Sequence, residues 1–275
     1  MRSFRREPRE LVDIRLDKMQ ADLEMNKISL KFGGMTALNK IDLTVRTGDL
    51  LSIIGPNGAG KTSLLNCITG NYQYQEGNIL FNDKLITSLP THQIINLGIS
   101  RTSQNIELFQ GISVLDNLLL ARHRHKNYNF IEAALFSRSV KKNEVYHREI
   151  VEELISFLEI EPIRNTLIGE LSQGMQKRVA LGRALALGPK LLLLDEPFTG
   201  ITFEEKEAMV RFVTTLNEVW NLTIILIEHD LPVVLNISKR IVVFDFGVKV
   251  AEGSPDFIQD HPQVIEAYLG DSSTF

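Results

Sequence analysis

The sequence has almost no cysteine, since Cys67 is the single one among 275 residues. One cysteine excludes an intrachain disulfide and fits a reducing compartment. Long hydrophobic runs are lacking too. The longest, such as "LLSIIG" and "LTIILIEHD", have the length of a strand and fall far short of the roughly 20 apolar residues that span a bilayer. We therefore expect no membrane-spanning helix, and we expect Cys67 to be a core residue.

Positive charge is not in excess. With 30 Lys and Arg against 34 Asp and Glu, the formal net charge is −4, whereas nucleic-acid-binding domains usually have a strong basic excess. The first residues, "MRSFRREPRELVDIRLDKMQ", are charged throughout and lack the apolar core of a secretory signal. We therefore expect residues 1–22 to form a charged extension, and we expect a cytoplasmic protein with no nucleic-acid partner.

The rest of the chain has the pattern of an α/β protein. The runs "LEMNKISLKF", "ALNKIDLTVRTGDLLSIIG" and "GNILFNDKLIT" have the composition of strands with Gly and Asn at their turns. Helix formers with helical spacing predominate from about Ser113 to Phe157. Unbroken apolar runs then alternate with helical segments, which is typical of a parallel sheet covered on both faces. We expect an α/β core, an antiparallel β portion, a helical insertion and two short helices in the tail.

A phosphate-binding loop stands in "LLSIIGPNGAGKTSLLNCITG", which matches G-x-x-x-x-G-K-[ST] between an apolar strand and an apolar helix. The glycines allow backbone N–H groups to surround phosphates, and the helix start adds its positive dipole end. We expect Lys61 to neutralise the β- and γ-phosphate oxygens and the Thr62 hydroxyl to bind Mg²⁺. The expected nucleotide-binding residues are Gly55, Pro56, Asn57, Gly58, Ala59, Gly60, Lys61, Thr62 and Ser63.

A second nucleotide motif is misleading. The segment "NKID", Asn39 to Asp42, resembles the guanine-reading motif of GTPases, but there it follows the P-loop, and here it precedes it. We therefore interpret this segment as a loop followed by the start of a strand.

Two neighbouring carboxylates, Asp195 and Glu196, end the buried run "LLLLDEP". In open α/β sheets ligands bind at the carboxyl ends of the strands, which is where the P-loop begins. We expect Asp195 to act in the Mg²⁺ shell and Glu196 to orient an attacking water and take its proton. His229 ends the next buried run, "LTIILIEHD", and we expect it to contact the γ-phosphate.

Two residues have both a functional and a structural interpretation. Gln104, in "GISRTSQNIELF", lies where the chain leaves the core for the helical segment. Its amide would reach Mg²⁺ or the attacking water, and its hinge position would report the nucleotide state to that segment; spacing alone does not decide this. Phe32, in "LKFGG", is expected to stack on adenine, with a core phenylalanine as the alternative.

The segment "LSQGMQKRVALGRALAL", Leu171 to Leu187, has no His, Cys, Asp or Glu for acid–base or metal chemistry. Its Ser172 and Gly174 lie where a helix begins, and a helix N-terminus attracts anions. With the P-loop, Gln104, the acidic pair and His229 in this order, residues from about Leu23 to Gly270 resemble the ATP-binding subunit of ABC transporters. In that comparison "LSQGM" corresponds to the family signature, usually LSGGQ.

The resemblance implies an ABC-type P-loop NTPase core at 23–270, with a parallel sheet, an antiparallel β subdomain and an inserted helical subdomain at about 105–170, followed by a tail at 271–275. It implies that Ser172 and Gly174 close over ATP held by a second copy's P-loop, in a head-to-tail dimer. The implied roles are catalysis for Glu196, His229 and Gln104, adenine contact for Phe32, and Mg²⁺ contact for Thr62, Gln104 and Asp195.

The implied partners are a second ATPase subunit, identical or different, and integral membrane permeases on which the helical subdomain docks. A periplasmic solute-binding protein would act indirectly, and the place of action would be the cytoplasmic face of the inner membrane. Longer strings, among them "GISRTSQNIELFQGISVLDNLLLARH" and "AEGSPDFIQDHPQVIEAYLG", are similar to the branched-chain amino acid importer ATPases with a long helical insertion. Urea and amide importers and, more distantly, lipopolysaccharide-export ATPases share many of these strings.

Two residues depart from the family pattern. Met175 replaces the usual glutamine of the signature, and Thr202 stands where the D-loop after the acidic pair usually has Asp or Asn. These departures motivate one alternative, a nucleotide-sensing module with little hydrolysis. A soluble ABC protein acting in translation or DNA maintenance is another, although the chain has neither the second cassette nor the basic linker usual in that class. Ser172, Gly174, Lys61, Glu196 and His229 are intact, so we expect ATP turnover.

Overall fold

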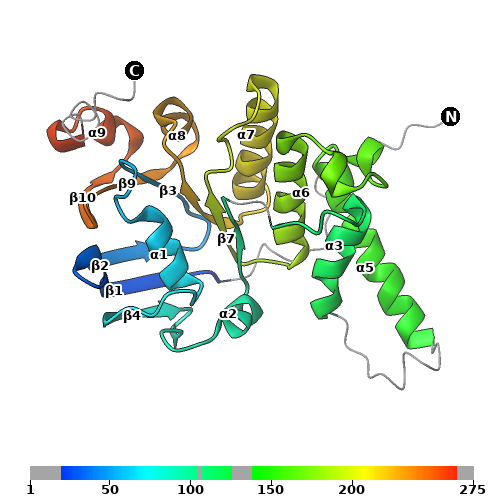
Figure 1. The fold of residues 1–275 in the computed structure, drawn as a ribbon, viewed down its shortest axis with the longest axis horizontal. Coiled ribbons are helices and arrows are strands. Elements are labelled where there is room, and N and C mark those ends of the chain that lie inside the picture. The colour runs from blue at the N-terminus through cyan, green and yellow to red at the C-terminus, as the bar shows by residue number, and fades with distance from the viewer. Residues whose placement is uncertain (1–19, 105–106, 126–137, 265–275) are drawn as a thin grey trace. The chain divides into compact units, whose positions relative to one another are not determined.

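The computed structural model describes residues 20–104, 107–125 and 138–264. The chain forms two compact units (Figure 1). One, here called the sheet unit, consists of the described residues within 16–104, 190–199 and 206–275. The other, the helical unit, consists of those within 105–189 and 200–205. The helical unit therefore begins just after Gln104 and continues beyond residue 170, the expected end of the insertion.

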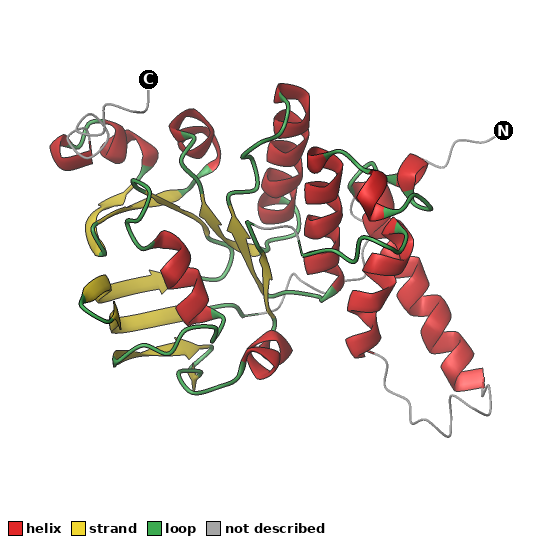
Figure 2. Cartoon of the chain, viewed as in Figure 1, coloured by secondary structure: helices red, strands yellow, loops and turns green. Residues whose placement is uncertain are grey.

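Two β-sheets build the sheet unit (Figure 2). An antiparallel sheet has the order β2-β1-β4-β5. Its strands are β1 (Leu23–Phe32), β2 (Met35–Val45), β4 (Glu76–Phe81) and β5 (Lys84–Leu85). The second sheet has the order β10-β9-β3-β8-β7-β6 and is parallel except for β10 at one edge. Its strands are β3 (Leu50–Ile54), β6 (Ile99–Thr102), β7 (Leu191–Asp195), β8 (Thr223–Ile227), β9 (Arg240–Asp245) and β10 (Val248–Gly253).

The central strands are apolar along their whole length because both of their faces are buried. Every residue of β3, β7 and β8 is buried, as expected for parallel strands inside an α/β sheet. The expected α/β core with an antiparallel portion is confirmed, as is the hairpin in "GNILFNDKLIT". The segment Asn39 to Asp42 lies entirely within β2, so the expected loop before the strand is wrong.

The largest hydrophobic cluster joins the two sheets around one helix. It contains residues of β1 and β2, of β3, and of α1 (Lys61–Ile68), among them Leu23, Leu51 and Leu64. Helix α1 is thus packed between the sheets, and Cys67 is buried on it, as expected. Burial raises the pKa of the Cys67 thiol to about 12. The described part of this unit also contains the helices α2 (Thr91–Leu97), α8 (Leu231–Ile237) and α9 (Pro255–Gln259).

A second hydrophobic cluster lies against α8 and α9. It joins Ile54 and Ile241 of the parallel sheet to Val234 of α8 and Ile258 of α9. Of the two short helices expected in the tail, α9 is confirmed, and most of the second falls outside the described residues. Helix α7 (Phe203–Glu218) begins in the helical unit and continues into the sheet unit.

The described part of the helical unit consists mostly of α3 (Val114–Arg122), α5 (Arg138–Phe157) and α6 (Gln173–Ala186), which contact one another pairwise. It also contains short 3₁₀ turns at His123–His125, Glu161–Ile163 and Ile168–Glu170. Gly182 allows the helices to approach, because an added Cβ there would lie 2.8 Å from Leu158 Cδ1. The expected helical region from Ser113 to Phe157 is confirmed where it is described, apart from residues 126–137, which lie outside the described residues.

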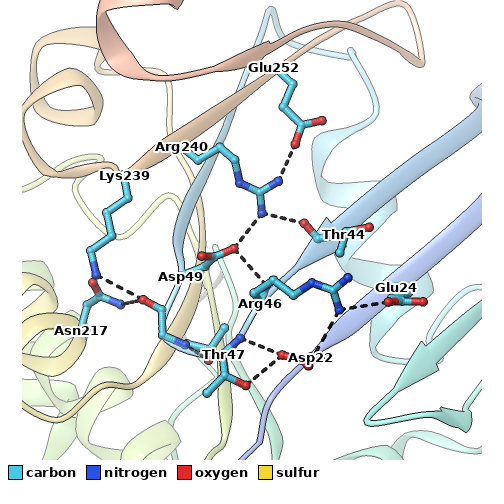
Figure 3. A network of polar contacts seen from close by, with 12 residues as sticks. Asp22, Glu24, Thr44, Arg46, Thr47, Asp49, Asn217, Lys239, Arg240 and Glu252 are labelled. Atoms are coloured by element: carbon cyan, nitrogen blue, oxygen red, sulfur yellow. Dashed lines mark hydrogen bonds and ion pairs between the residues drawn. The ribbon is translucent and has the colours of Figure 1, made fainter.

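A network of ion pairs and hydrogen bonds gathers where several strands of the sheet unit begin (Figure 3). Arg240, the first residue of β9, donates to Asp49 Oδ2 at 2.8 Å and to the Thr44 carbonyl, and also contacts Glu252. Asp49 immediately precedes β3 and accepts from the Arg46 backbone N–H. These contacts join both sheets at the amino ends of β3 and β9. Among the residues that the structure describes, no helix is long and apolar enough to cross a membrane.

Candidate active site

The predicted phosphate-binding residues form a loop between β3 and α1. Gly55, Gly58 and Gly60 have φ values of 146°, 80° and 99°, which favour glycine. Gly60 is also crowded, because an added Cβ would lie 2.4 Å from the Ala37 carbonyl oxygen. The glycines therefore allow the loop its tight shape beside the start of α1, where free backbone N–H groups attract phosphate.

Lys61 is the first residue of α1, and its ammonium group lies over the loop. Its Nζ donates to the carbonyl oxygens of Gly55 at 2.6 Å and Pro56 at 2.8 Å. Burial lowers the pKa of Lys61, while the carboxylates of Glu196 and Asp195 act in the opposite direction. The lysine charge therefore lies close to both members of the acidic pair. The P-loop and the end of β7 therefore face a common space in the sheet unit.

The acidic pair has two different environments. Asp195 ends β7, and its side chain is fully buried. Its Oδ2 accepts a hydrogen bond from Arg101 Nη2 at 2.7 Å, and its Oδ1 has no partner among the described residues. Glu196 follows with φ 49°, a conformation uncommon for residues other than glycine, and its side chain is 12% exposed. This conformation lets two adjacent carboxylates point into different surroundings.

Three residues predicted to be catalytic come together at one carboxylate. Gln104 Nε2 donates to Glu196 Oε2 at 2.9 Å. His229 Nδ1 lies 3.9 Å from Glu196 Oε1, and the histidine side chain is 47% exposed. Strand β6 leads to Gln104, β7 to Glu196 and β8 to His229, so the carboxyl ends of parallel strands assemble the group. The geometry suits a general base that is held between two polar side chains.

The residues fit a magnesium ion bound mainly through a nucleotide. Thr62 is exposed at the start of α1, and Asp195 Oδ1 is a buried acceptor that lacks a partner among the described residues. The described residues contain no group of three His, Cys, Asp or Glu side chains arranged to hold a metal. Proteins usually bind Mg²⁺ through one or two side chains, waters and substrate phosphates. A site with few protein ligands therefore fits this ion.

Phe32 lies at the surface and not in the core. Its side chain is 43% exposed at the end of β1, so the alternative of a core phenylalanine is wrong. Its ring meets that of Tyr72 edge to face, with centroids 5.2 Å apart. Tyr72, 37% exposed, was not singled out from the sequence. The pair forms a rigid aromatic surface that is open to a planar ligand.

The signature segment, Leu171 to Met175, begins α6 in the helical unit. Ser172 is the N-cap, and its Oγ accepts from the Met175 N–H at 3.2 Å. The same hydroxyl donates to Glu205 Oε1 at 3.1 Å. Gly174 leaves room for this carboxylate, because an added Cβ would lie 2.0 Å from Glu205 Cδ. The expected helix start is confirmed, with a carboxylate of the same unit resting on it.

Thr202, which stands where the family usually has Asp or Asn, caps the start of a helix. Its Oγ1 accepts from the Glu205 N–H at 3.3 Å, and its own N–H donates to Glu205 Oε2 at 3.0 Å. This reciprocal arrangement is a capping box at the start of α7. Glu205 thus joins the cap of α7 to the signature serine. The pattern T-x-x-E in "TFEE" was the sequence signal for this link.

Glu228 is a further residue that sequence reasoning missed. It is buried directly before His229, and it accepts from the N–H groups of Phe198 at 2.8 Å and His229 at 3.2 Å. Burial raises its pKa above the ordinary value. The sequence contained a signal for this burial, because Glu228 directly follows the apolar run of β8. Glu228 holds the segment after β7 against the segment after β8.

Two ranges of the chain match known protein families. Residues 38–199, more than half of the chain, match the family described as ABC transporter. Residues 248–273 match the family described as branched-chain amino acid ATP-binding cassette transporter. The first range includes the P-loop, Gln104, the signature segment and the acidic pair.

The chain is also similar to curated transport proteins over nearly its whole length. It is 37% identical to the high-affinity branched-chain amino acid transport ATP-binding protein BraF of Pseudomonas aeruginosa, over 91% of this chain and 98% of that protein. It is 35% identical to LivG of Escherichia coli K12, of the same description, over 91% and 98%. A probable LivG of Archaeoglobus fulgidus is 34% identical over 90% and 95%.

Solved structures give the same grouping. The chain is similar to the ADP conformation of MJ1267, an ATP-binding cassette of an ABC transporter, with a TM-score of 0.77 and 31% identity over 92% of this chain and 100% of that one. A nucleotide-free ATP-binding cassette from an ABC transporter gives a TM-score of 0.78 with the same identity and coverage.

Proposed function

The chain belongs to the ABC transporter family of ATP-binding subunits, and from this premise we propose that it hydrolyses ATP to power an importer of branched-chain or other hydrophobic amino acids. Its relatives BraF and LivG are named for branched-chain amino acid transport, and its C-terminal region matches the corresponding family. The observation that carries the proposal is the meeting of Gln104 and His229 at Glu196, close to the charge of Lys61.

The reaction assigned to this site is attack of water on the γ-phosphate. Glu196 takes the proton of the attacking water, and the Gln104 amide and the His229 ring hold the carboxylate and the water in place. Lys61 and the backbone N–H groups of the P-loop stabilise the negative charge that spreads over the phosphate oxygens. Phe32, supported by Tyr72, stacks on adenine. In this assignment the residues of the sheet unit bind ATP and do the chemistry.

Magnesium is the cofactor that these residues suit. Thr62 and Asp195 would hold it, with Gln104 as a third candidate, and the ion would neutralise charge on the β- and γ-phosphate oxygens. Asp195 is the stronger of the two carboxylate candidates, because its Oδ1 lacks a partner among the described residues, whereas Glu196 already contacts Gln104. The two acids thereby have separate tasks.

The partners proposed are a second ATPase subunit and two membrane permeases, with a periplasmic solute-binding protein acting through the permeases. Ser172 and Gly174 lie at the start of α6, where a helix N-terminus attracts anions and the Glu205 carboxylate accepts from Ser172. We assign this site to ATP held by the second subunit. The helical unit is the proposed docking surface for the permeases, which places the protein at the cytoplasmic face of the inner membrane.

The test is ATP-driven uptake by the chain reconstituted with its permeases and solute-binding protein in vesicles. Wild type should accumulate labelled leucine, and Glu196→Gln should lose about 100-fold or more of the hydrolysis rate, the usual contribution of a general base. Glu76→Gln, which changes an exposed glutamate of β4, is the control and should act like wild type. Uptake of urea without leucine would reassign the solute. Leucine uptake by wild type at the same rate with and without ATP would contradict the proposal altogether.

A further inference from the structure

Arg101 occupies a position that neither the family motifs nor the proposed mechanism uses. It lies on β6, with only 14% of its side chain exposed. Its Nη1 donates to Asn66 Oδ1 on α1 at 2.6 Å, and its Nη2 donates to Asp195 Oδ2 at 2.7 Å. The guanidinium group therefore lies between the helix that follows the P-loop and the carboxylate that ends β7, all within the sheet unit.

Arg101 supplies a charged partner to the buried Asp195 side chain. The Asp195 side chain is fully buried, and a buried carboxylate without a partner is strongly destabilising. A charge-assisted hydrogen bond from arginine offsets that cost. Arg101 is therefore the partner that the chain itself supplies to the buried Asp195 side chain.

The same contact leaves one oxygen of Asp195 available. Arg101 holds Oδ2, and Oδ1 has no hydrogen-bond partner in the described part of the chain. Because a carboxyl group is planar, a hydrogen bond that holds Oδ2 also limits the directions in which Oδ1 points. Glu196 has different contacts, with Gln104 and His229. Arg101 thus distinguishes the two members of the acidic pair.

Asn66 holds the other side of the guanidinium. It lies five residues after Lys61 on α1, so the Arg101 position depends on the helix whose first turn faces the phosphates. A movement of α1 would be transmitted to Asp195 through two hydrogen bonds, each shorter than 3 Å.

We propose that Arg101 is a positioning residue that holds the Asp195 carboxyl group in place and directs its free oxygen toward the magnesium ion of Mg·ATP, with Asn66 keeping Arg101 in place. The inference rests on the proposed function, because it concerns the metal that accompanies ATP. Arg101 contacts neither the nucleotide nor the reacting atoms in this proposal. It acts only through Asp195.

The proposal predicts different effects on nucleotide affinity without metal and nucleotide affinity with metal. Loss of a purely structural ion pair would change both affinities together. Nucleotide affinity without metal depends on the P-loop and Phe32, so Arg101 variants should leave it unchanged. Nucleotide affinity with metal depends on Asp195. Removing a group that orients a metal ligand typically weakens metal binding about 10- to 100-fold. Loss of a structural pair alone would weaken both affinities equally.

The experiment measures binding of a fluorescent ATP analogue to the full chain, first in EDTA and then during a titration with Mg²⁺. Arg101→Gln should raise the half-saturating Mg²⁺ concentration about 10-fold or more, with affinity in EDTA unchanged within about 2-fold. Arg101→Lys keeps the charge but cannot reach both partners, and it should give a shift in the same direction. Asn66→Ala, which leaves the Arg101–Asp195 pair, should give a smaller shift.

Arg46→Gln is the matched control, because Arg46 forms an ion pair with Glu24 in the network of Figure 3, away from the acidic pair. It should leave the Mg²⁺ titration unchanged. An unchanged titration in folded Arg101→Gln or Arg101→Lys, or an equal loss of affinity with and without metal, would overturn the inference alone. Failure of the wild-type chain to bind the analogue in any condition would overturn the proposed function and the inference together.

Discussion

Two aromatic residues illustrate what a single contact adds at the residue scale. Phe32 by itself is an exposed ring at a strand end, and Tyr72 meets it edge to face from the segment after α1. Edge-to-face pairs are worth about 0.5–1.5 kcal/mol beyond the area they bury. The contact therefore fixes the plane of Phe32, which a stacking ligand requires, more than it stabilises the fold.

Phe32→Ala should weaken ATP binding about 10-fold, because base–aromatic stacking contributes about 1–3 kcal/mol. Tyr72→Ala should weaken it less, since Phe32 remains but loses its support. Isothermal titration with Mg·ATP measures both. Phe257→Ala, which removes another half-exposed phenylalanine from a ring pair with His261, is the control. Equal affinity of Phe32→Ala and wild type would remove Phe32 from the site.

Glu228 should make stability depend on pH. Burial raises its pKa above the ordinary glutamate value of 4.5, so between 4.5 and the raised value the folded chain binds more protons than the unfolded chain. The contribution of Glu228 to the free energy of unfolding therefore falls as pH rises through that interval. Glu228→Gln cannot titrate but still accepts from the Phe198 N–H.

Urea unfolding at several pH values from 4 to 8 (roughly the range in which a raised carboxyl titrates) measures this effect. Relative to wild type, Glu228→Gln should gain stability as pH rises, by about 1.4 kcal/mol for each unit by which the pKa is raised. Glu76→Gln, at an exposed position, should show no such trend. A difference between Glu228→Gln and wild type that is constant over the whole range would contradict the prediction.

The residues that sequence reasoning found are those whose spacing follows a motif. Gly55 to Thr62, Asp195, Glu196 and His229 were found in this way, and the structure brings Gln104 and His229 to Glu196. Arg101 and Tyr72 were missed because their partners lie far away in the sequence, at Asp195 and Phe32. A pattern along the chain contains no signal for a contact between segments that meet only after folding.

At the scale of elements, the start of α7 is specified by its own sequence. Thr202 and Glu205 exchange hydrogen bonds across the first turn, so the residue that departs from the usual Asp or Asn is still a good N-cap. Glu205 also accepts from Ser172. The beginning of α7 and the beginning of α6 are therefore linked through one carboxylate within the helical unit.

Thr202→Ala should destabilise the chain by about 0.5–2 kcal/mol, the usual cost of losing an N-cap side chain. Glu205→Gln should cost less, because glutamine also serves in a capping box. Chemical denaturation of both variants is the measurement. Glu204→Gln, a change of the same kind one residue earlier in the first turn, controls for the loss of charge. A Thr202→Ala variant with the same free energy of unfolding as wild type would show that the capping box does not stabilise the start of α7.

Element types were predictable because their patterns are strong. Continuous apolar runs predicted β7 and β8. The Ser172 cap and the helical pattern of the residues that follow it predicted α6. The error at Asn39 to Asp42 has a physical reason. Lys40 has φ 50° within β2, a backbone conformation that is more common in turns than in strands. The nearby Asn39 and Asp42 are residue types that are frequent in turns. Strand pairing tolerates such an irregularity, and local propensity does not reveal it.

At the scale of the whole molecule, the proposed function requires two copies of the cassette. Ser172→Arg should block ATP-dependent dimer formation in a Glu196→Gln background, while each subunit still binds ATP with affinity unchanged within about 2-fold, because the arginine acts across the proposed interface and carries bulk into it. Size-exclusion chromatography with and without ATP measures dimer formation.

Ser254→Arg provides the matched control, since Ser254 is the N-cap of α9 and accepts from the Phe257 N–H as Ser172 does from Met175. It should dimerise like the parent. Normal dimerisation of the Ser172→Arg variant would mean that the signature segment does not meet the second subunit. Loss of ATP binding by the isolated Ser172→Arg subunit would assign Ser172 to the nucleotide of its own chain instead.

The parallel sheet has charged groups at both ends, with different tasks. The groups assigned to ATP follow the carboxyl ends of β3, β6, β7 and β8, whereas Arg240, Asp49 and their partners stand at the amino ends of β9 and β3 (Figure 3). Strand β3 has five residues and so spans about 17 Å between the two groups. The two groups are therefore separated by the length of a wholly buried strand.

This separation bears on how such a cassette changes over generations. The amino ends hold none of the groups assigned to ATP, so we expect substitutions there to change folding more than turnover. A lineage is thus able to adjust its tolerance of heat or salt at the amino ends without retuning its turnover.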